Sequence, residues 1–380
     1  MMRTMHALPQ TGSTRALVHL DAFRRNIGSV RSYCGKGTRI MAVVKANAYG
    51  HGVIELSREA LREGVDSLGV ARVSEALEIR KSGITHPLLV FEVPPQSMID
   101  PAIAEGITLS VSTAEGGAAI SRVASQRGGN AAVHVKVDTG MGRLGFPDQA
   151  APADIASLLR LPHLELAGVY SHFATSEDPD TSFAKGQIAR YNEVIEKLRT
   201  MGIDVPLRHM ANSGAVISLP EARFDMVRPG IMLYGYPPSP SMHQRYPLTP
   251  VMSLVSNISM LRTVGKGTSI SYGRRFIAPA STTIATVPIG YGDGYSRLLT
   301  NQASVLIRGK LHPVVGTICM DHLMIDVGTD PECRTGDDVT LIGTDGSLSI
   351  TAWDIAKTLG TIPYEVTCLI SGRVPRHFVG

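Results

Sequence analysis

The stretch SLGVARVSEALEIRKSGITHPLLVF, residues 67–91, contains a helical pattern between two short apolar runs. The runs SLGVA (67–71) and LLVF (88–91) have the length and composition of buried strands, and SEALEIRKSG (74–83) between them is typical of a helix. A strand, a helix and a second strand in this order indicate a parallel βαβ unit.

Six further apolar runs extend this pattern in both directions along the chain. They are IMAVV (40–44), TLSVS (108–112), AVHVKV (132–137), LAGVYS (166–171), LRHMA (207–211) and MVRPGIM (226–232). Helical patterns separate them, as in residues 184–202, where apolar residues from Ile188 to Leu198 recur at helical spacing. Eight strands that alternate with helices over about 230 residues predict an α/β fold, a (β/α)8 barrel.

The last third of the chain contains short β-branched segments separated by Gly or Pro. We interpret as antiparallel strands the segments 251–264, 282–289, 303–308, 313–318, 322–327 and 338–342. Thr351 is a candidate cap for one short helix that ends at Leu359. Because Pro and Ser cluster in residues 236–247, we predict a barrel over 14–240 and a mainly β domain over 241–380, and we expect residues 1–13 to be disordered.

Composition and charge are those of an ordinary globular protein. Of the 380 residues, 43% are hydrophobic and 18% are charged, and the net charge of +4 comes from scattered Lys and Arg residues, which argues against nucleic acid as a partner. No stretch approaches the ~20 apolar residues of a membrane helix, and the N-terminus lacks the apolar core of a signal peptide. The four cysteines form no CxxC pair. We therefore expect a cytoplasmic protein that has no membrane partner.

Candidate ligand-binding residues follow the ends of the predicted barrel strands. They are Lys45, Lys136, Asp138, His172, His209, Asn212, Ser213, Arg228, Gly230 and Ile231. In barrels of this type the chemistry lies at the carboxyl ends of the strands, so these residues are expected to converge on one mouth. Each residue alone could be an ordinary loop residue, but their shared position favours a site.

Lys45 directly follows the apolar run MAVV. Partial burial of a lysine favours its neutral, nucleophilic form, which suits covalent chemistry with a carbonyl group; the alternative is a lysine that extends to solvent at the barrel rim. The sequence has no GxxxxGK[ST] and no GxSxG, so ATP-binding and serine-hydrolase hypotheses lack their motifs. It has no HExxH either, and its scattered histidines are only a weak metal signal, so we expect no metal.

Nine blocks, in order across both predicted domains, resemble the alanine racemase family. They are MAVVKANAYGHG (41–52), VKVDTGMGRLGF (135–146), SHFATSED (171–178), HMANSGA (209–215), MVRPGIMLYG (226–235), SISYGRRF (269–276), GYGDGYSR (290–297), GTICMDH (316–322) and PYEV (363–366). The resemblance implies a pyridoxal-phosphate enzyme that interconverts L- and D-alanine, for peptidoglycan synthesis or for alanine catabolism.

The resemblance also implies roles for individual residues. Lys45 would carry pyridoxal 5'-phosphate, and the family's cofactor contacts correspond to Tyr49, Arg143, His172, Asn212, Ser213, Arg228, Gly230, Ile231 and Tyr364. Arg228 would face the pyridine nitrogen, with His172 between it and Tyr272. Arg143 and the Met320 backbone N–H would hold the substrate carboxylate. Lys136 matches a lysine that is carbamylated in family members, and an unmodified charged Lys136 is the alternative.

Racemisation needs one base on each face of the substrate, because a proton leaves one side of the α-carbon and returns on the other. By resemblance these bases are Tyr272, which takes the proton of L-alanine, and Lys45, which takes that of D-alanine. Tyr272 lies in the predicted β domain and Lys45 in the barrel. The family forms a head-to-tail homodimer, so the resemblance implies that each active site combines both chains.

Other functions stay open at this point. The nearest alternative is a broad-specificity or serine racemase of the same fold. A pyridoxal-phosphate decarboxylase and a non-catalytic carrier of this cofactor resemble the chain less, and a carrier needs no second domain with a second base. A metal-dependent barrel hydrolase, which EDTA would inactivate, fits least well.

Overall fold

The computed structural model describes residues 13–35, 37–243 and 246–380. They divide into two compact units, which we call the barrel unit (residues 22–249) and the C-terminal unit (residues 13–21 and 250–380). Apart from Ser13, the residues that we expect to be disordered lie outside the described part. No helix in the described part is both long enough and apolar enough to cross a membrane.

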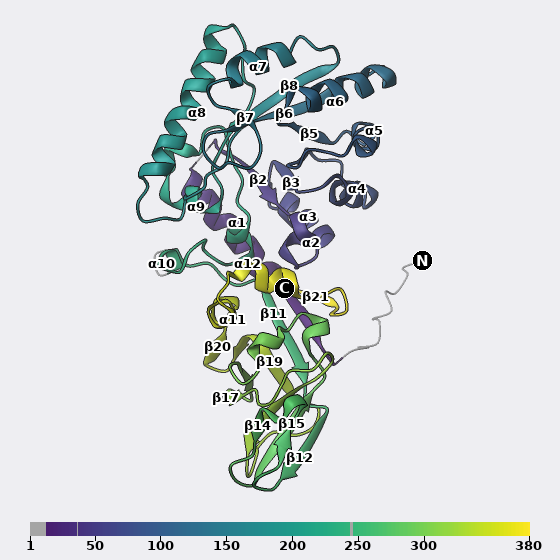
Figure 1. Cartoon of the computed structure of the whole chain (residues 1–380), viewed down its shortest axis with the longest axis vertical. Coiled ribbons are helices and arrows are strands. Elements are labelled where there is room, and N and C mark those ends of the chain that lie inside the picture. Colours follow the sequence, from purple (N-terminus) through teal and green to yellow (C-terminus); the bar gives the residue numbers. More distant parts are fainter. Residues whose placement is uncertain (1–12, 36, 244–245) are drawn as a thin grey trace. The chain divides into compact units, whose positions relative to one another are not determined.

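The barrel unit is a closed ring of eight parallel strands (Figure 1). Neighbouring strands follow the order β5-β4-β3-β2-β10-β9-β8-β6, and β6 pairs with β5 to close the ring. The strands are β2 (Arg39–Val43), β3 (Ser67–Val70), β4 (Leu88–Val90), β5 (Thr108–Val111), β6 (Ala131–Asp138), β8 (Leu164–Tyr170), β9 (Arg208–His209) and β10 (Met226–Val227). Each overlaps one predicted run, which confirms the barrel.

Helices surround this ring on the outside (Figure 1). They are α1 (Leu20–Cys34), α3 (Val53–Arg62), α4 (Val73–Lys81), α5 (Gln96–Ala104), α6 (Ala114–Arg127), α7 (Ala151–Leu158), α8 (Ser182–Thr200) and α9 (Ser213–Ser218). The helical patterns at 74–83 and 184–202 correspond to α4 and α8. Ile188, Tyr191 and Leu198 of α8 are buried, as their spacing predicts.

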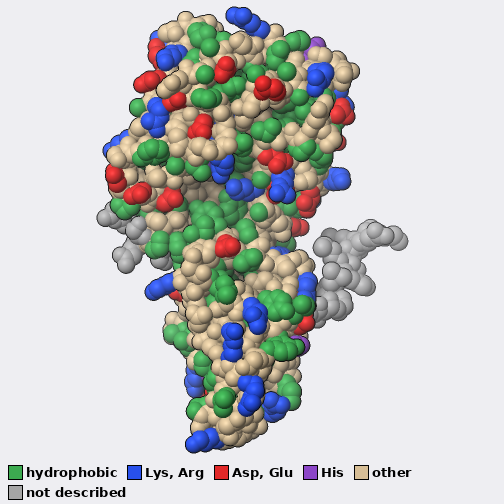
Figure 2. Space-filling view, viewed as in Figure 1, with side chains coloured by type: hydrophobic (Ala, Val, Ile, Leu, Met, Phe, Trp, Pro, Cys, Tyr) green, Lys and Arg blue, Asp and Glu red, His purple; other side chains and the backbone are tan. Residues whose placement is uncertain are grey.

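Basic and acidic side chains intermingle over the face of the barrel unit seen in Figure 2. This visible face has no continuous basic surface of the kind that binds the phosphate backbone of a nucleic acid.

The C-terminal unit is mainly β, as predicted. Its larger sheet has the order β17-β16-β19-β11-β1-β21 with β20 beside β19, and β12-β15-β18 and β13-β14 form two smaller sheets. The strands are β1 (Arg15–His19), β11 (Met252–Asn257), β12 (Met260–Val264), β13 (Ser269–Ile270), β14 (Phe276–Ile277), β15 (Thr282–Val287), β16 (Ser304–Ile307), β17 (Lys310–Pro313), β18 (Leu323–Gly328), β19 (Asp338–Asp345), β20 (Leu348–Ile350) and β21 (Arg376–Val379). The helices are α11 (Ala352–Leu359), which Thr351 caps as predicted, and α12 (Pro363–Leu369).

Three details differ from the predictions. Residues 251–264 form two strands in different sheets, β11 and β12, rather than one. The predicted strand 313–318 is wrong over most of its length, because the chain leaves β17 after Pro313, makes one isolated bridge at Val314 and then turns. The sequence predicts that the barrel begins at residue 14, whereas β1 pairs antiparallel with β11 and parallel with β21 in the C-terminal unit.

Candidate active site

The carboxyl ends of the barrel strands bring the predicted residues to one mouth. Lys45 follows β2, Lys136 and Asp138 end β6, His172 follows β8 and Arg228 follows β10. Because all eight strands are parallel, these ends lie on the same side of the ring.

Lys45 is half-buried and begins an unusual turn. The next four residues, Ala46 to Tyr49, have φ between 52° and 54°, the left-handed region that costs a non-glycine residue about 1–2 kcal/mol. Hydrogen bonds offset this cost: Ala46 N–H donates to Glu75 Oε1 at 2.6 Å, and Val53 N–H donates to Asn47 Oδ1 at 2.8 Å. The turn sets the positions of Lys45 and Tyr49, although none of the residues between them is glycine.

Tyr49, Ser213 and Gly230 form a compact polar cup. A Cβ added to Gly230 would lie 2.4 Å from the Tyr49 hydroxyl, so only glycine leaves room there. Ser213 Oγ accepts the N–H groups of Gly230 at 2.9 Å and Met232 at 3.4 Å, which leaves its own proton to donate elsewhere. The hydroxyl groups of Tyr49 and Ser213 can donate hydrogen bonds, and the backbone at Gly230 carries no side chain that would block a ligand. Such a site suits an anionic group such as a phosphate.

Arg228 is buried and held by neutral acceptors. Its Nη2 donates to the carbonyl oxygens of Ser171 at 2.7 Å and Met210 at 3.1 Å, and Nη1 donates to His209 Nδ1 at 2.8 Å. Burial lowers the pKa of Arg228 to about 10, so the guanidinium stays charged at neutral pH. It is a fixed cation inside the barrel mouth.

His172 lies next to this cation. Its Nδ1 is 3.3 Å from Arg228 Nη2, so Nδ1 accepts the hydrogen bond because a guanidinium has no lone pair to offer. Burial, followed by the charge of Arg228, holds the pKa of His172 well below its ordinary value. The ring is therefore neutral and carries its proton on Nε2.

Lys136 is 3% exposed, and its Nζ has no hydrogen-bond partner among the described residues. The ammonium position lies 5.2 Å from the ring centroid of Tyr170. Burial, then the charges of Arg228 and Arg143, lower the pKa of Lys136 to about 7. A buried amine without a partner, near two cations, fits a group that gains a negative charge by modification.

Asp138 shapes the loop that carries Arg143. Its carboxylate accepts the backbone N–H groups of Gly140, Met141 and Gly142 at 2.9–3.1 Å. Although burial raises its pKa, these hydrogen bonds hold the pKa of Asp138 below the ordinary value. Arg143 itself is exposed, which leaves it accessible to a ligand.

In the C-terminal unit, Tyr272 is 72% exposed. It follows Ser271, a non-glycine residue at φ 64°, and its carbonyl oxygen accepts the Thr317 hydroxyl at 2.7 Å. Ser271 Oγ donates to the Thr317 carbonyl at 2.5 Å and lies 3.4 Å from Cys319 Sγ. These contacts tie Tyr272 to the loop 316–320, which explains why residues 315–318 leave the predicted strand.

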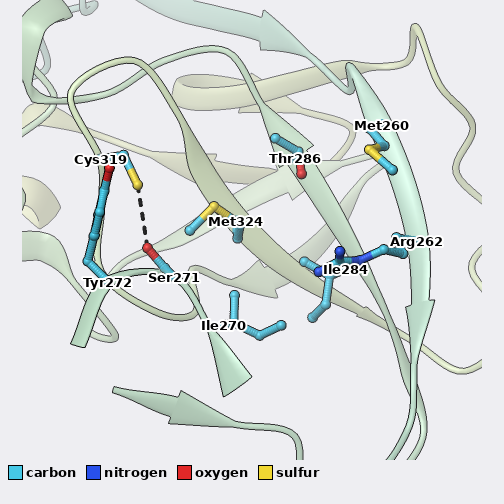
Figure 3. Close-up of a pocket in the computed structure, with 9 residues that line it drawn as sticks. All are labelled: Met260, Arg262, Ile270, Ser271, Tyr272, Ile284, Thr286, Cys319 and Met324. Carbon is cyan, nitrogen blue, oxygen red and sulfur yellow. Dashed lines mark hydrogen bonds between the residues drawn. The ribbon is translucent and has the colours of Figure 1, made fainter. Parts of the chain in front are cut away.

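A cavity of about 430 Å³ lies beside Tyr272 (Figure 3). Ser271, Tyr272 and Cys319 line one side, and Met260 and Arg262 of β12 line the other. The exposed tyrosine thus stands at the edge of a partly apolar hollow within the C-terminal unit.

Met320 is 51% exposed and held by its backbone. Its carbonyl oxygen accepts Gly292 N–H at 2.9 Å, and the neighbouring Cys319 carbonyl accepts Tyr291 N–H at 3.1 Å. A Cβ on Gly290 would lie 2.4 Å from the Met320 oxygen, so this glycine is required for the two loops to pack. The arrangement fixes the main chain at Met320.

Three further predicted cofactor contacts lie at the starts of helices. Asn212 Oδ1 caps α9 by accepting Ala215 N–H at 3.0 Å and also accepts the Ser176 hydroxyl at 2.8 Å. Tyr364 is half-buried in the first turn of α12, in the C-terminal unit. Ile231 begins the 3-10 helix η2 (Ile231–Tyr234) beside Gly230.

The side chains inside the barrel below this site were not predicted from the sequence. Ser110, His134 and Tyr170 are buried, and Tyr170 stacks on His209 with ring centroids 4.9 Å apart and planes at 3°. The available signal was the two-residue period of a strand, because His134 must lie on the same face of β6 as Lys136.

Comparisons with known proteins agree over nearly the whole chain. Residues 18–238 match the family model of the alanine racemase N-terminal domain, and residues 251–378 match that of the C-terminal domain. Alanine racemase 2 of Caldanaerobacter subterraneus subsp. tengcongensis is 43% identical over 96% of this chain and 95% of the relative. The solved alanine racemase of Clostridium difficile 630 has a TM-score of 0.93 at 38% identity, covering 97% of this chain and 96% of that one.

A more distant solved structure carries a different substrate in its name. The histidine racemase of Leuconostoc mesenteroides subsp. sake has a TM-score of 0.90 at 28% identity, covering 98% of this chain and 99% of that one. The same fold therefore serves more than one amino acid.

Proposed function

The chain belongs to the alanine racemase family, and from this premise we propose that Lys45 and Tyr272 are the two bases with which it interconverts L- and D-alanine. The enzyme uses pyridoxal 5'-phosphate, which supplies an electron sink for the α-carbon of the substrate when it is bound. The observation that supports the proposal is the barrel mouth, where Lys45 lies on the same side of the ring as a cup suited to a phosphate.

The residues of the mouth have separate tasks in this proposal. Lys45 would hold the cofactor covalently and would move a proton on one face of the α-carbon. Tyr49, Ser213, Gly230 and Ile231 would bind the phosphate, and Asn212 shapes the start of α9. Arg228 would be the residue that contacts the pyridine nitrogen.

Arg228 has a chemical consequence at that nitrogen. A carboxylate there would keep the nitrogen protonated and strengthen electron withdrawal, whereas a guanidinium has no acceptor for a proton. We expect the weaker electron sink to suppress transamination, a side reaction that leaves the amino group on the cofactor. His172 accepts a hydrogen bond from Arg228. Through its Nε2–H it would orient Tyr272 and stabilise the deprotonated form of that tyrosine.

We propose a homodimer in which the barrel mouth of one chain is completed by Tyr272 and Met320 of its partner. Tyr272 is 72% exposed and Met320 is 51% exposed, so both are accessible to a second chain. Proton transfer at Tyr272 requires that water be kept away from its hydroxyl group. The barrel of a second chain would exclude this water.

Arg143→Ala should weaken alanine binding more than it weakens cofactor binding. Arginine suits a carboxylate because its fork can bind both oxygens, and loss of such a charged contact costs about 1.5–3 kcal/mol, or roughly 10- to 150-fold in KM. The measurements are KM for alanine and the cofactor content after dialysis. Arg199→Ala, which removes an exposed arginine of α8, is the control. Cofactor loss with normal alanine binding after reconstitution would assign Arg143 another role.

We propose that Lys136 is carbamylated. Its neutral amine attacks the carbon of CO2, an N–C bond forms and one proton is released, which leaves an anion beside Arg143 and Arg228. Because the pKa of Lys136 is lowered to about 7, the neutral amine predominates above that pH, and carbamylation should increase as the pH rises through 7.

A ¹³C NMR spectrum of protein equilibrated with ¹³C-bicarbonate at pH 8 should therefore show a carbamate signal that Lys136→Ala removes. Lys197→Ala, at an exposed position of α8, should retain the signal. The proposal fails if Lys136→Ala keeps it.

The activity itself is tested by incubating the purified protein with L-alanine, L-serine and L-lysine and resolving the enantiomers. Alanine should be racemised fastest. Equal or faster racemisation of serine or lysine would indicate a broad-specificity racemase instead.

A further inference from the structure

A layer of polar side chains fills the barrel below Arg228. Ser110, His134, Tyr170 and His209 are at most 5% exposed and come from four different strands, β5, β6, β8 and β9. Buried polar groups need partners, and the hydrogen bonds of this layer permit only one arrangement of protons on its two histidines.

The arrangement begins at Arg228. Its Nη1 lies 2.8 Å from His209 Nδ1, and a guanidinium carries donors only, so Nδ1 must present a lone pair. Burial, then the charge of Arg228, hold the pKa of His209 well below its ordinary value, so the ring is neutral. A neutral ring with a lone pair on Nδ1 has its proton on Nε2.

That Nε2–H in turn needs an acceptor, which His134 supplies. His134 Nδ1 lies 2.7 Å from His209 Nε2. Burial, with a smaller effect of Arg228, lowers the pKa of His134 to about 3, so this ring is neutral too and can offer a lone pair on Nδ1. The hydrogen bonds then run in one direction, from Arg228 to His209 and from His209 to His134.

The surroundings hold both rings in place. A Cβ on Gly168 of β8 would lie 2.9 Å from His134 Cε1 and 3.0 Å from Nδ1, so glycine leaves the space that the ring occupies. Tyr170, two residues further on, stacks on His209, and its hydroxyl lies 2.8 Å from Ser110 Oγ. Tyr170 thus fixes the plane of His209, and His134 is the group that can fix its tautomer.

We propose that His134 is a positioning residue, which keeps His209 in the Nε2–H tautomer so that Nδ1 accepts from Arg228. Without His134, the proton of His209 can move to Nδ1, where it would face the N–H of Arg228. Because the N–H of His209 and the N–H of Arg228 would then point at each other and repel, the guanidinium would move from its position in the barrel mouth. The inference deepens the role proposed above for Arg228, but the tautomers can be measured whatever the enzyme racemises.

The test combines NMR of ¹⁵N-histidine-labelled protein with kinetics of the holoenzyme. In the unmodified protein, both His134 and His209 should show a protonated Nε2 and an unprotonated Nδ1. His134→Leu should shift His209 towards the Nδ1–H tautomer, lower kcat about tenfold with KM for alanine within about twofold, and raise the fraction of turnovers that end in transamination.

Two variants separate this role from simple stabilisation of the barrel. His134→Asn can place an amide oxygen near the position of Nδ1, so it should restore the tautomer and most of kcat. Ser110→Ala removes the partner of the Tyr170 hydroxyl in the same layer and should lower stability while leaving the tautomer and the transamination fraction unchanged.

The proposal is overturned if His209 of the unmodified protein carries its proton on Nδ1, a result that needs no variant to fold. It is also overturned if His134→Leu keeps both the tautomer of His209 and the transamination fraction of the unmodified enzyme. A protein with the expected tautomers that fails to racemise alanine would contradict the proposed function and leave this inference standing.

Discussion

Replacing Lys45 with alanine is expected to abolish the covalent attachment of pyridoxal phosphate and to lower racemisation by more than about 10³-fold, because one residue is both the attachment point and a base. The unmodified protein should absorb visible light, and borohydride should fix the cofactor to the peptide that contains Lys45. Absorbance, peptide mapping by mass spectrometry and the racemisation rate measure these effects.

The matched control for Lys45→Ala is Lys185→Ala, at an exposed position of α8. It should keep both colour and activity. The assignment of Lys45 fails if borohydride labels another lysine, or if an active protein is colourless.

The second large effect concerns the two chains of the proposed dimer. Tyr272→Phe should keep bound, coloured cofactor and lose racemisation, since phenylalanine has no hydroxyl to carry a proton. Mixed with Lys45→Ala, it should regain activity. Random reassociation of equal amounts gives about half heterodimers, each with one intact site and one doubly defective site, so about a quarter of the unmodified activity should return.

Subunit exchange must be shown independently in that experiment, for example with differently tagged chains. Each variant reassociated with itself is the control and should stay inactive. If exchange occurs and activity does not return, the two bases come from one chain or Tyr272 is not a base.

Most of the fold was predictable because local patterns determine it. Each barrel strand is a short apolar run between a turn and a helix, and α8 shows its buried stripe directly in the sequence. The position of β1 was not predictable in this way. Its partners β11 and β21 lie more than 230 residues further along the chain, and five alternating residues do not reveal which sheet they join.

The segment 313–318 shows how a loop overrides β propensity. Its β-branched residues favour a strand, but Gly316 has φ 73° and lies so close to Ile270 that a Cβ would be 2.8 Å from the Ile270 carbonyl oxygen. The chain turns there, which places Cys319 Sγ 3.4 Å from Ser271 Oγ and the Thr317 hydroxyl 2.7 Å from the Tyr272 carbonyl oxygen.

The residues of the site that follow the barrel strands were predictable from the sequence. The backbone conformation and the buried partners of these residues were not. Position alone placed Lys45, His172 and Arg228 at one mouth, and the structure agrees. Nothing in the residues Ala46 to Tyr49 signals a left-handed turn, because alanine ordinarily avoids that region and the turn depends on Glu75 from α4. The buried partner of His209 is equally non-local, since His134 lies 75 residues earlier.

The central claim is that Lys45 and Tyr272 act on opposite faces of the same α-carbon, and one measurement tests it most directly. Tyr272→Phe, incubated in D2O with D-alanine or L-alanine, is followed by ¹H NMR for loss of the α-proton. With Lys45 intact and the tyrosine hydroxyl absent, D-alanine should exchange its α-proton with solvent more readily than L-alanine. Exchange of L-alanine at an equal or higher rate would contradict the assignment of Tyr272 to the L face.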